Sequence, residues 1–303
     1  MVRNRQSPIA NNQLRPADGQ LRLADDQLRR PDGQSSLADG QLAIGYLQSA
    51  IDTALARAFL YSFLARAFEG PEEQNWSWMR STESRQALWS SVTTLNHPAL
   101  ETAAHTFVSR LTPDGLDSFT DDYVTAFGHA ARGLCPMNEI EYGDLKADAL
   151  FQPHCLADLG AFYRAFGLEV AEDAAERHDH ICIELEFLSA LAAKEAYALE
   201  KQLYAEDLAL GRDAQKKFLR EHLGRWTPAF TRRLARLVAE DSVLKTLASF
   251  THAFIEAECA RFGVTPGSED LLLRPVDEAS DSLCTACGIQ NLPPGALSTA
   301  TQI

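Results

Sequence analysis

The chain has 303 residues, of which 46% are hydrophobic and 23% are charged, as in ordinary soluble globular proteins. These values exclude fibrous and wholly disordered proteins, and the length allows one large domain or two smaller ones. The 28 basic and 42 acidic residues give a net charge of −14. This charge argues against a nucleic-acid partner and favours basic partners.

The N-terminal residues form four seven-residue units between Gln13 and Gly40. A seven-residue period is typical of coiled coils, but Pro16, Pro31 and the recurring glycines would break such a helix. We therefore expect residues 1–44 to form a flexible, low-complexity tail. The tail holds six Arg and five Asp, which leaves 22 basic and 37 acidic residues, a net charge of −15, in the rest of the chain.

No segment has the features of a membrane span or an export signal. The most apolar stretch, Ala50 to Phe68, contains Arg57 and Arg66 and therefore predicts an amphipathic helix. Arg29-Arg30 is not followed by the hydrophobic stretch of a twin-arginine signal. Six cysteines in 303 residues are too sparse for a disulfide framework. We expect a cytoplasmic protein.

From Gly45 onward the pattern of apolar residues is helical. The first helix has an apolar stripe with spacings of four to five residues and stops at Gly70-Pro71; the stripe comprises Leu47, Ile51, Leu55, Phe59, Phe63 and Phe68. Further helices are predicted over residues 83–95, 99–111, 116–127, 155–166, 177–209, 213–223, 228–239 and 242–262. Because no strand alternation is present, we predict an all-α fold: a single helical bundle domain over residues 45–262, followed by an irregular tail over residues 263–303.

Two metal sites and the functions that go with them have to be considered. Glu176, His180 and Glu184 lie at helical spacing, so a metal-dependent oxidoreductase in the helical bundle is one alternative. No Glu-x-x-His pair is present there, and Asp179 fits equally well as an N-cap or first-turn residue of a helix. The second alternative is a zinc- or redox-responsive regulator that uses Cys284 and Cys287, although one CxxC pair is a weak zinc signal.

Motifs for nucleotide binding and for hydrolysis are missing. The sequence has no GxxxxGK[ST], GxGxxG or GxSxG motif. These absences argue against a nucleotide-binding protein and against a hydrolase, and we expect no cofactor.

Four segments resemble the TorD/DmsD/NarJ family of redox-enzyme maturation chaperones. They are Asp122 to Phe127, the loop Cys135 to Tyr142, Leu156 to Glu169, and Arg177 to Leu188. The loop looks closest to that of family members that serve enzymes similar to dimethylsulfide and ethylbenzene dehydrogenases.

Three positions depart from the family pattern. Ala126 stands where the family usually has Leu, Cys135 replaces the first Pro of the Pro-Pro-x-Glu-Ser loop, and Ile140 stands at its Ser position. Pro136 and Glu139 match the loop pattern.

The resemblance implies a cytoplasmic chaperone, not an enzyme. It would bind the twin-arginine signal peptide, the apo catalytic subunit of a molybdopterin oxidoreductase, or both, until the molybdenum cofactor is inserted and the client is exported. The sequence leaves open whether the chaperone is a monomer or a dimer.

The partner-binding residues are expected in the loop and at the start of the helix that follows Arg177. In this interpretation Glu139 and Asp179 meet arginines of the client by charge-assisted hydrogen bonds, His180 donates to a backbone carbonyl, and Phe127 forms an apolar wall. The full set comprises Phe127, Pro136, Asn138, Glu139, Tyr142, Asp179 and His180.

Overall fold

The structure, a computed structural model, describes residues 37–128, 133–143, 151–171, 174 and 176–274. In this part the chain forms ten α-helices, one 3-10 helix and two isolated β-bridges, without a β-strand, so the all-α prediction is confirmed. The helices are α1 (Leu37–Phe68), α2 (Glu73–Arg80), α3 (Thr82–Leu95), α4 (Pro98–Arg110), α5 (Leu116–Phe127), α6 (Phe151–Ala165), α7 (Ile181–Glu200), α8 (Ala205–Glu221), α9 (Leu223–Leu237) and α10 (Val243–Phe262), with the 3-10 helix η1 (Glu139–Glu141) between α5 and α6.

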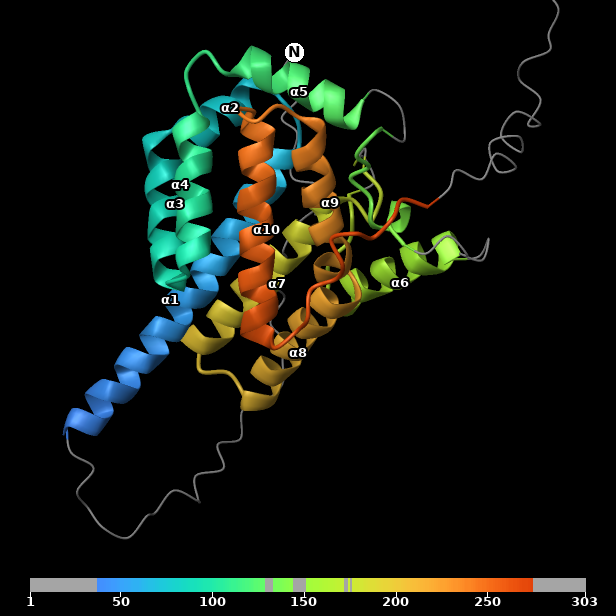
Figure 1. Ribbon diagram of the computed structural model, residues 1–303. Coiled ribbons are helices and arrows are strands. Elements are labelled where there is room, and N and C mark those ends of the chain that lie inside the picture. The colour runs from blue at the N-terminus through green and yellow to red at the C-terminus, as the bar shows by residue number, and fades with distance from the viewer. Residues whose placement is uncertain (1–36, 129–132, 144–150, 172–173, 175, 275–303) are drawn as a thin grey trace, which may run out of the picture.

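Helices α1 and α7 pack along each other through the middle of the bundle. α3 packs on α1, and α10 packs between α4 and α9. α8 packs against both α7 and α9, α5 lies across the upper end, and α6 lies on the side away from α3 and α4 (Figure 1). None of the described helices is both long enough and apolar enough to cross a bilayer.

The second half of α1 is buried on nearly every side because it is a central helix. Leu60, Tyr61, Leu64 and Ala65 are all buried. The predicted one-sided stripe is therefore partly wrong, since Leu55 remains 51% exposed.

A buried ionic network joins four helices around Arg57. Its guanidinium group donates to both carboxylate oxygens of Glu258 on α10 at 2.9 and 2.7 Å and to Glu195 on α7 at 2.8 Å. It also donates to the amide oxygen of Gln215 on α8, and the Tyr61 hydroxyl donates to Glu258 at 2.9 Å. Because Arg57 is 1% exposed, the network is part of the core of the bundle.

Several helix boundaries differ from the sequence predictions. α1 begins at Leu37, within the segment expected to be a flexible tail, and α2 was not predicted. The helix predicted over residues 177–209 is divided: α7 ends at Glu200, Gln202 adopts a positive φ of 50°, and α8 begins at Ala205. Most of the N-terminal repeats, together with Cys284 and Cys287, lie outside the described residues.

Candidate functional site

The loop of residues 133–143 is attached to the start of α7 by backbone hydrogen bonds. The amide of Glu139 donates to the carbonyl of Asp179, and the amide of Ile181 donates to the carbonyl of Met137, both at 2.9 Å. Between these two bonds, Asn138 and His180 form an antiparallel β-bridge. The two motifs that were matched separately in the sequence therefore form one structural unit.

Asp179 is completely buried and holds this unit together. Its carboxylate accepts from the side chain of Asn138 and from the amide of Ile140, each at 3.2 Å. Arg177 adds two hydrogen bonds at 3.0 Å, one to each carboxylate oxygen. The arginine that Asp179 meets in this structure thus belongs to the same chain.

Glu139 connects the loop to the region where α8 meets α9. It is 1% exposed and accepts from Arg225 at 2.8 Å and from Nδ1 of His222 at 3.0 Å. Burial by itself would raise the pKa of Glu139, but the hydrogen bond and charge of His222, together with Arg225, outweigh burial and lower it. Glu139 is therefore ionised and paired within the chain.

His180 is the N-cap of α7. Its Nδ1 accepts from the amide of Cys182 at 3.3 Å, which satisfies one of the free amides at the helix start. Burial, followed by the positive charge of Arg177, lowers the pKa of His180 to about 4. The imidazole is therefore neutral at physiological pH, and its Nδ1 acts as a hydrogen-bond acceptor. The role expected from the sequence, a donor to a backbone carbonyl, is not the one seen here.

Aromatic residues of α5 and α9 pack against the loop. The Tyr142 hydroxyl donates to the carbonyl of Pro136 at 2.8 Å, and its ring lies 5.3 Å from the ring of Trp226. Phe127 at the end of α5 and Tyr142 both contact Phe230 of α9. These contacts give the loop a fixed shape.

Residues 272–274, the last that the structure describes, also pack on the loop. The amide of Gly143 donates to the carbonyl of Leu272 at 3.0 Å, and the amide of Arg274 donates to the carbonyl of Glu141 at 2.8 Å. Gly143 has a φ of +155°, and a Cβ atom there would lie 2.3 Å from the Arg274 side chain. Only glycine fits this position without rearrangement.

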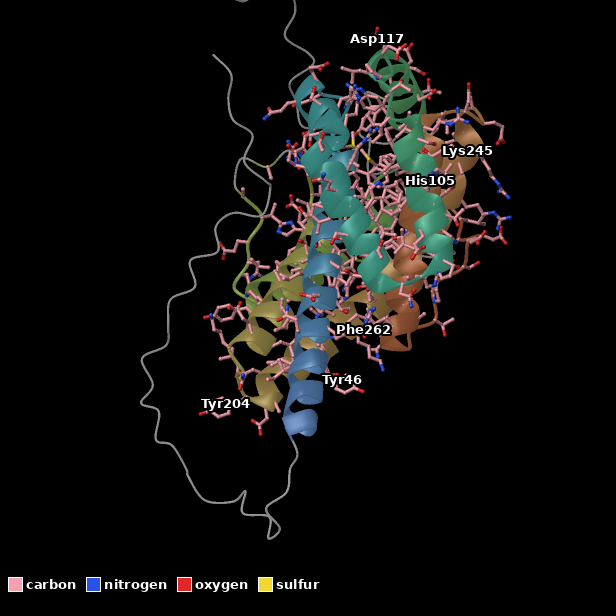
Figure 2. All side chains as sticks on the ribbon, turned by 90° about the vertical axis from the view of Figure 1, so that its left-hand side faces the viewer. Tyr46, His105, Asp117, Tyr204, Lys245 and Phe262 are labelled. Atoms are coloured by element: carbon pink, nitrogen blue, oxygen red, sulfur yellow. The ribbon has the colours of Figure 1, made fainter. Side chains whose placement is uncertain are left out.

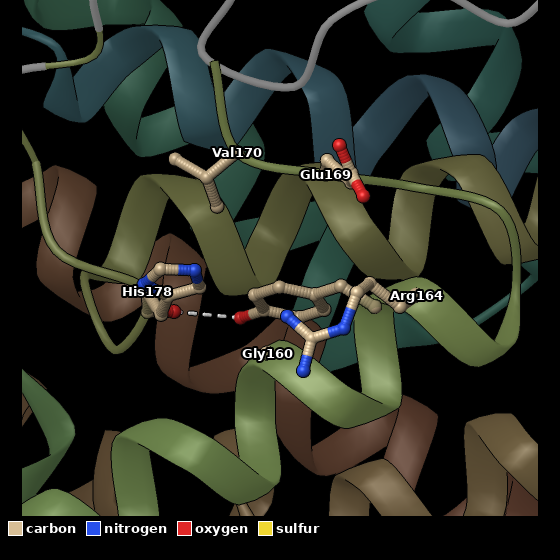
Figure 3. A pocket seen from close by; sticks show the side chains of 6 residues that line it. Gly160, Arg164, Glu169, Val170 and His178 are labelled. Atoms are coloured by element: carbon tan, nitrogen blue, oxygen red, sulfur yellow. Dashed lines mark hydrogen bonds between the residues drawn. The ribbon is translucent and has the colours of Figure 1, made fainter. Parts of the chain in front are cut away.

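A polar hollow of about 250 Å³ lies beside the unit. Gly160 and Arg164 of α6, Glu169 and Val170 beyond it, and His178 line this space. Figure 3 shows His178 on one side and Arg164 and Glu169 on the other, with a hydrogen bond of 2.7 Å from the Tyr163 hydroxyl to the carbonyl of His178.

Three glutamates lie close together near the loop; we call Glu69, Glu72 and Glu176 the acidic rim. Partial burial raises the pKa of Glu69, and the charges of Glu176 and Glu72 raise it further. Tyr123 joins this region to the loop, since its hydroxyl donates to the carbonyl of Phe68 at 3.0 Å and lies 3.9 Å from the sulfur of Met137.

The structure thus brings the seven predicted site residues into one region, but it buries six of them. They are Phe127, Pro136, Glu139, Tyr142, Asp179 and His180. Asn138 is half-buried, so a rigid partner docking on this surface would reach it most easily. Direct client binding by these residues stays a prediction.

Sequence reasoning gave no role to Arg177, His222 and Arg225. Arg177 lies two residues from its carboxylate partner Asp179, which is a signal that could have been read. His222 and Arg225 are 83 and 86 residues from Glu139, so nothing local in the sequence connects them.

The sequence also offered Glu176, His180 and Glu184 as possible metal ligands. Glu176, His180 and Glu184 do not form a metal-ligand cluster among the described residues. Glu184 is completely buried and accepts from Nε1 of Trp226 at 3.1 Å. Burial, and then the charge of Glu139, raise its pKa well above the usual range.

Comparison with known proteins identifies the family. A family described as "Nitrate reductase delta subunit" matches residues 94–232, which include the loop and Asp179. A selenate reductase assembly chaperone protein from Thauera selenatis is 32% identical over 164 residues, which cover 51% of this chain and 79% of that protein. The chain belongs to the TorD/NarJ family of reductase assembly chaperones.

Two further relatives carry names of the same kind. The perchlorate reductase assembly chaperone protein of Dechloromonas aromatica (strain RCB) is 28% identical over 184 residues, covering 59% of this chain and 77% of that protein. The chlorate reductase assembly chaperone protein of Ideonella dechloratans is 38% identical over 79 residues, which cover 26% of this chain and 39% of that protein. These relatives confirm the predicted family and a chaperone rather than an enzyme, and they do not support an oxidoreductase or a zinc- or redox-responsive regulator.

Proposed function

We propose that this chaperone binds the apo catalytic subunit of a molybdopterin-containing reductase, together with its twin-arginine signal peptide, in the cytoplasm before cofactor insertion and export. The names of three relatives, which are assembly chaperones for selenate, chlorate and perchlorate reductases, support a reductase as the client. The chain would act by binding alone.

We propose the acidic rim and the adjoining loop as the surface that contacts the signal peptide. The observation that carries this assignment is the position of Glu69 and Glu176 near Tyr123, with Glu72 near Glu69 and the Tyr123 hydroxyl beside the Met137 sulfur. A twin-arginine signal places basic residues directly before an apolar segment. Clustered carboxylates beside a thioether and an aromatic ring match both parts.

In this proposal the predicted site residues divide into two groups. Asn138 is half-buried and contacts the client directly. Glu139, Asp179 and His180 position the loop, because their side chains are buried and bond to other parts of the chain. Phe127, Pro136 and Tyr142 support the loop from the apolar side.

The domain boundaries are also part of the proposal. Residues 45–262 would be the chaperone domain, extended at its N-terminal end by the first turns of α1, which starts at Leu37. Residues 1–44 and 263–303 would be accessory segments, although Leu272 and Arg274 already contact the loop.

Calorimetric titration with a twin-arginine signal peptide tests the contact surface. We expect saturable binding that becomes about tenfold weaker in a Glu69→Gln/Glu176→Gln double variant, because two exposed charge pairs together contribute roughly 1.4 kcal/mol. Asn138→Asp keeps the size of the side chain but would place a second carboxylate beside Asp179, so Asn138→Ala is the better test: it should weaken binding, and because it also removes a donor to Asp179, its unfolding should be measured in parallel.

A Glu206→Gln variant is the matched control. Glu206 is exposed on α8 and follows Tyr204 by two residues. Tyr204 lies at the end of the molecule opposite Asp117 of α5 (Figure 2). The surface assignment is wrong if all variants bind the peptide as tightly as the wild type, or if Glu206→Gln has the same effect as the double variant.

A further inference from the structure

We propose a Zn²⁺ site between α6 and the junction of α8 and α9, with the Cys155 thiolate, Nε2 of His222 and the Asp158 carboxylate as its protein ligands. The ion would join α6 to the part of the molecule that holds Glu139. This inference is independent of the proposed client.

Cys155 and His222 already lie near one another, and Asp158 lies near His222; the exposed Asp158 side chain would turn toward the thiol to complete the set. Single ligand atoms of Glu139, Cys155 and His222 are all within 4.8 Å of each other. Asp158, one turn after Cys155 on α6, places Oδ2 3.8 Å from Nε2 of His222. A sulfur, an imidazole nitrogen and a carboxylate oxygen form a ligand set that zinc accepts, with water as the fourth ligand.

The orientation of His222 indicates which nitrogen faces the ion. Nδ1 lies 3.0 Å from the Glu139 carboxylate, and Nε2 is buried without a hydrogen-bond partner among the described residues. The side chain of His222 is only 5% exposed, so water cannot compensate fully for the missing partner. A carboxylate on one ring nitrogen and a free second nitrogen is the arrangement that orients histidines toward zinc.

The surrounding charges favour a cation. The negative charges of Glu139 and Asp179 act on Cys155. One oxygen of the buried Glu184 carboxyl also has no hydrogen-bond partner among the described residues. Arg225 is the positive group that faces Glu139 here. A divalent ion would offset the excess negative charge and displace the thiol proton into solvent.

The ion has a path to the site. The Asp158 side chain is 65% exposed and Cys155 is half-buried, so the α6 side is open to water, while His222 closes the inner side. Cys155 and Asp158 can therefore be substituted without opening the core.

Metal analysis of the untagged full-length protein tests the site. After treatment with a chelator, the protein is titrated with Zn²⁺ and, separately, with Co²⁺. We expect one Zn²⁺ per chain, a higher Tm with zinc, and a thiolate-to-cobalt charge-transfer band. Cys155→Ser and Asp158→Asn should each weaken zinc binding at least tenfold, and Cys155→Ser should abolish the band.

Two controls separate this site from other thiols. Cys182→Ser changes a buried thiol of α7 that takes no part in the cluster and should leave zinc binding unchanged. Cys284→Ser/Cys287→Ser removes the CxxC pair and should also leave the stoichiometry unchanged. The proposal is overturned if the wild type binds no zinc, if Cys155→Ser binds zinc normally, or if only the loss of the CxxC pair abolishes binding.

Discussion

His180 links the stability of the α7 start to pH. Its pKa falls from the ordinary 6.5 to about 4 in the folded chain, so the unfolded chain binds the proton more readily at intermediate pH. Stability from this group is therefore complete above about pH 6.5 and is lost as the pH falls toward 4. Between pH 7 and pH 5 the loss should be about 2 kcal/mol.

A His180→Asn variant isolates this contribution. Asn keeps an acceptor for the Cys182 amide and cannot be protonated, so it caps α7 at every pH. Urea unfolding at pH 7 and pH 5 should show a smaller loss of stability in the variant than in the wild type, by about 2 kcal/mol. If both proteins lose the same amount, His180 is not the buried neutral group described here.

For these single residues, the sequence predicted which side chains lie in one region but not which groups they form hydrogen bonds with. Glu139, Asp179 and His180 were selected because the family motifs include them, and the structure places them within one hydrogen-bonded unit. Their partners include Arg225, which is 86 residues from Glu139 and is brought near only by the folding of α9. Local sequence cannot show that a carboxylate is already neutralised by a distant arginine.

Among the elements, the ionic network around Arg57 controls how four helices meet. Replacing Arg57 by Met would leave Glu258 and Glu195 buried without their main cation. We expect a loss of about 3–5 kcal/mol, because breaking a buried pair exposes the full desolvation cost of the remaining charges. Chemical denaturation monitored by circular dichroism measures this change.

Arg212→Met is the matched control for that variant. Arg212 also bonds to Glu195, at 2.7 Å, but 47% of its side chain is exposed. Its removal should cost no more than about 1 kcal/mol. Equal losses in the two variants would mean that the Arg57 network adds nothing beyond a surface ion pair.

The helix predictions succeeded where caps and breakers are local and failed where tertiary packing decides. The helix predicted over residues 242–262 agrees with α10, whose start is capped by Ser242 and whose last residue, Phe262, is followed by Gly263 in the left-handed conformation. By contrast, the break between α7 and α8 has no Gly or Pro; the non-glycine residue Gln202 takes the positive φ instead. The exposure of Leu55 likewise follows from which helices surround α1, which periodicity does not contain.

At the level of the whole molecule, we propose that this helical bundle holds a reductase subunit before cofactor insertion. Tyr123 of α5 contacts both Phe68, next to the acidic rim, and Met137 of the loop, and Asp117 of α5 lies at the end of the molecule opposite Tyr204 (Figure 2). Residues 45–303 carry a net charge of −15, so an electrostatic part of the binding should weaken as salt rises.

The most direct measurement is titration of the purified chaperone with the catalytic subunit of a reductase encoded beside its gene, prepared both without and with its molybdenum cofactor. Light scattering and calorimetry would report the stoichiometry and Kd of each complex. We predict a stable complex with the apo subunit and at least tenfold weaker binding of the loaded subunit. Equal affinity for both forms, or no complex with the apo subunit, would contradict the assembly function.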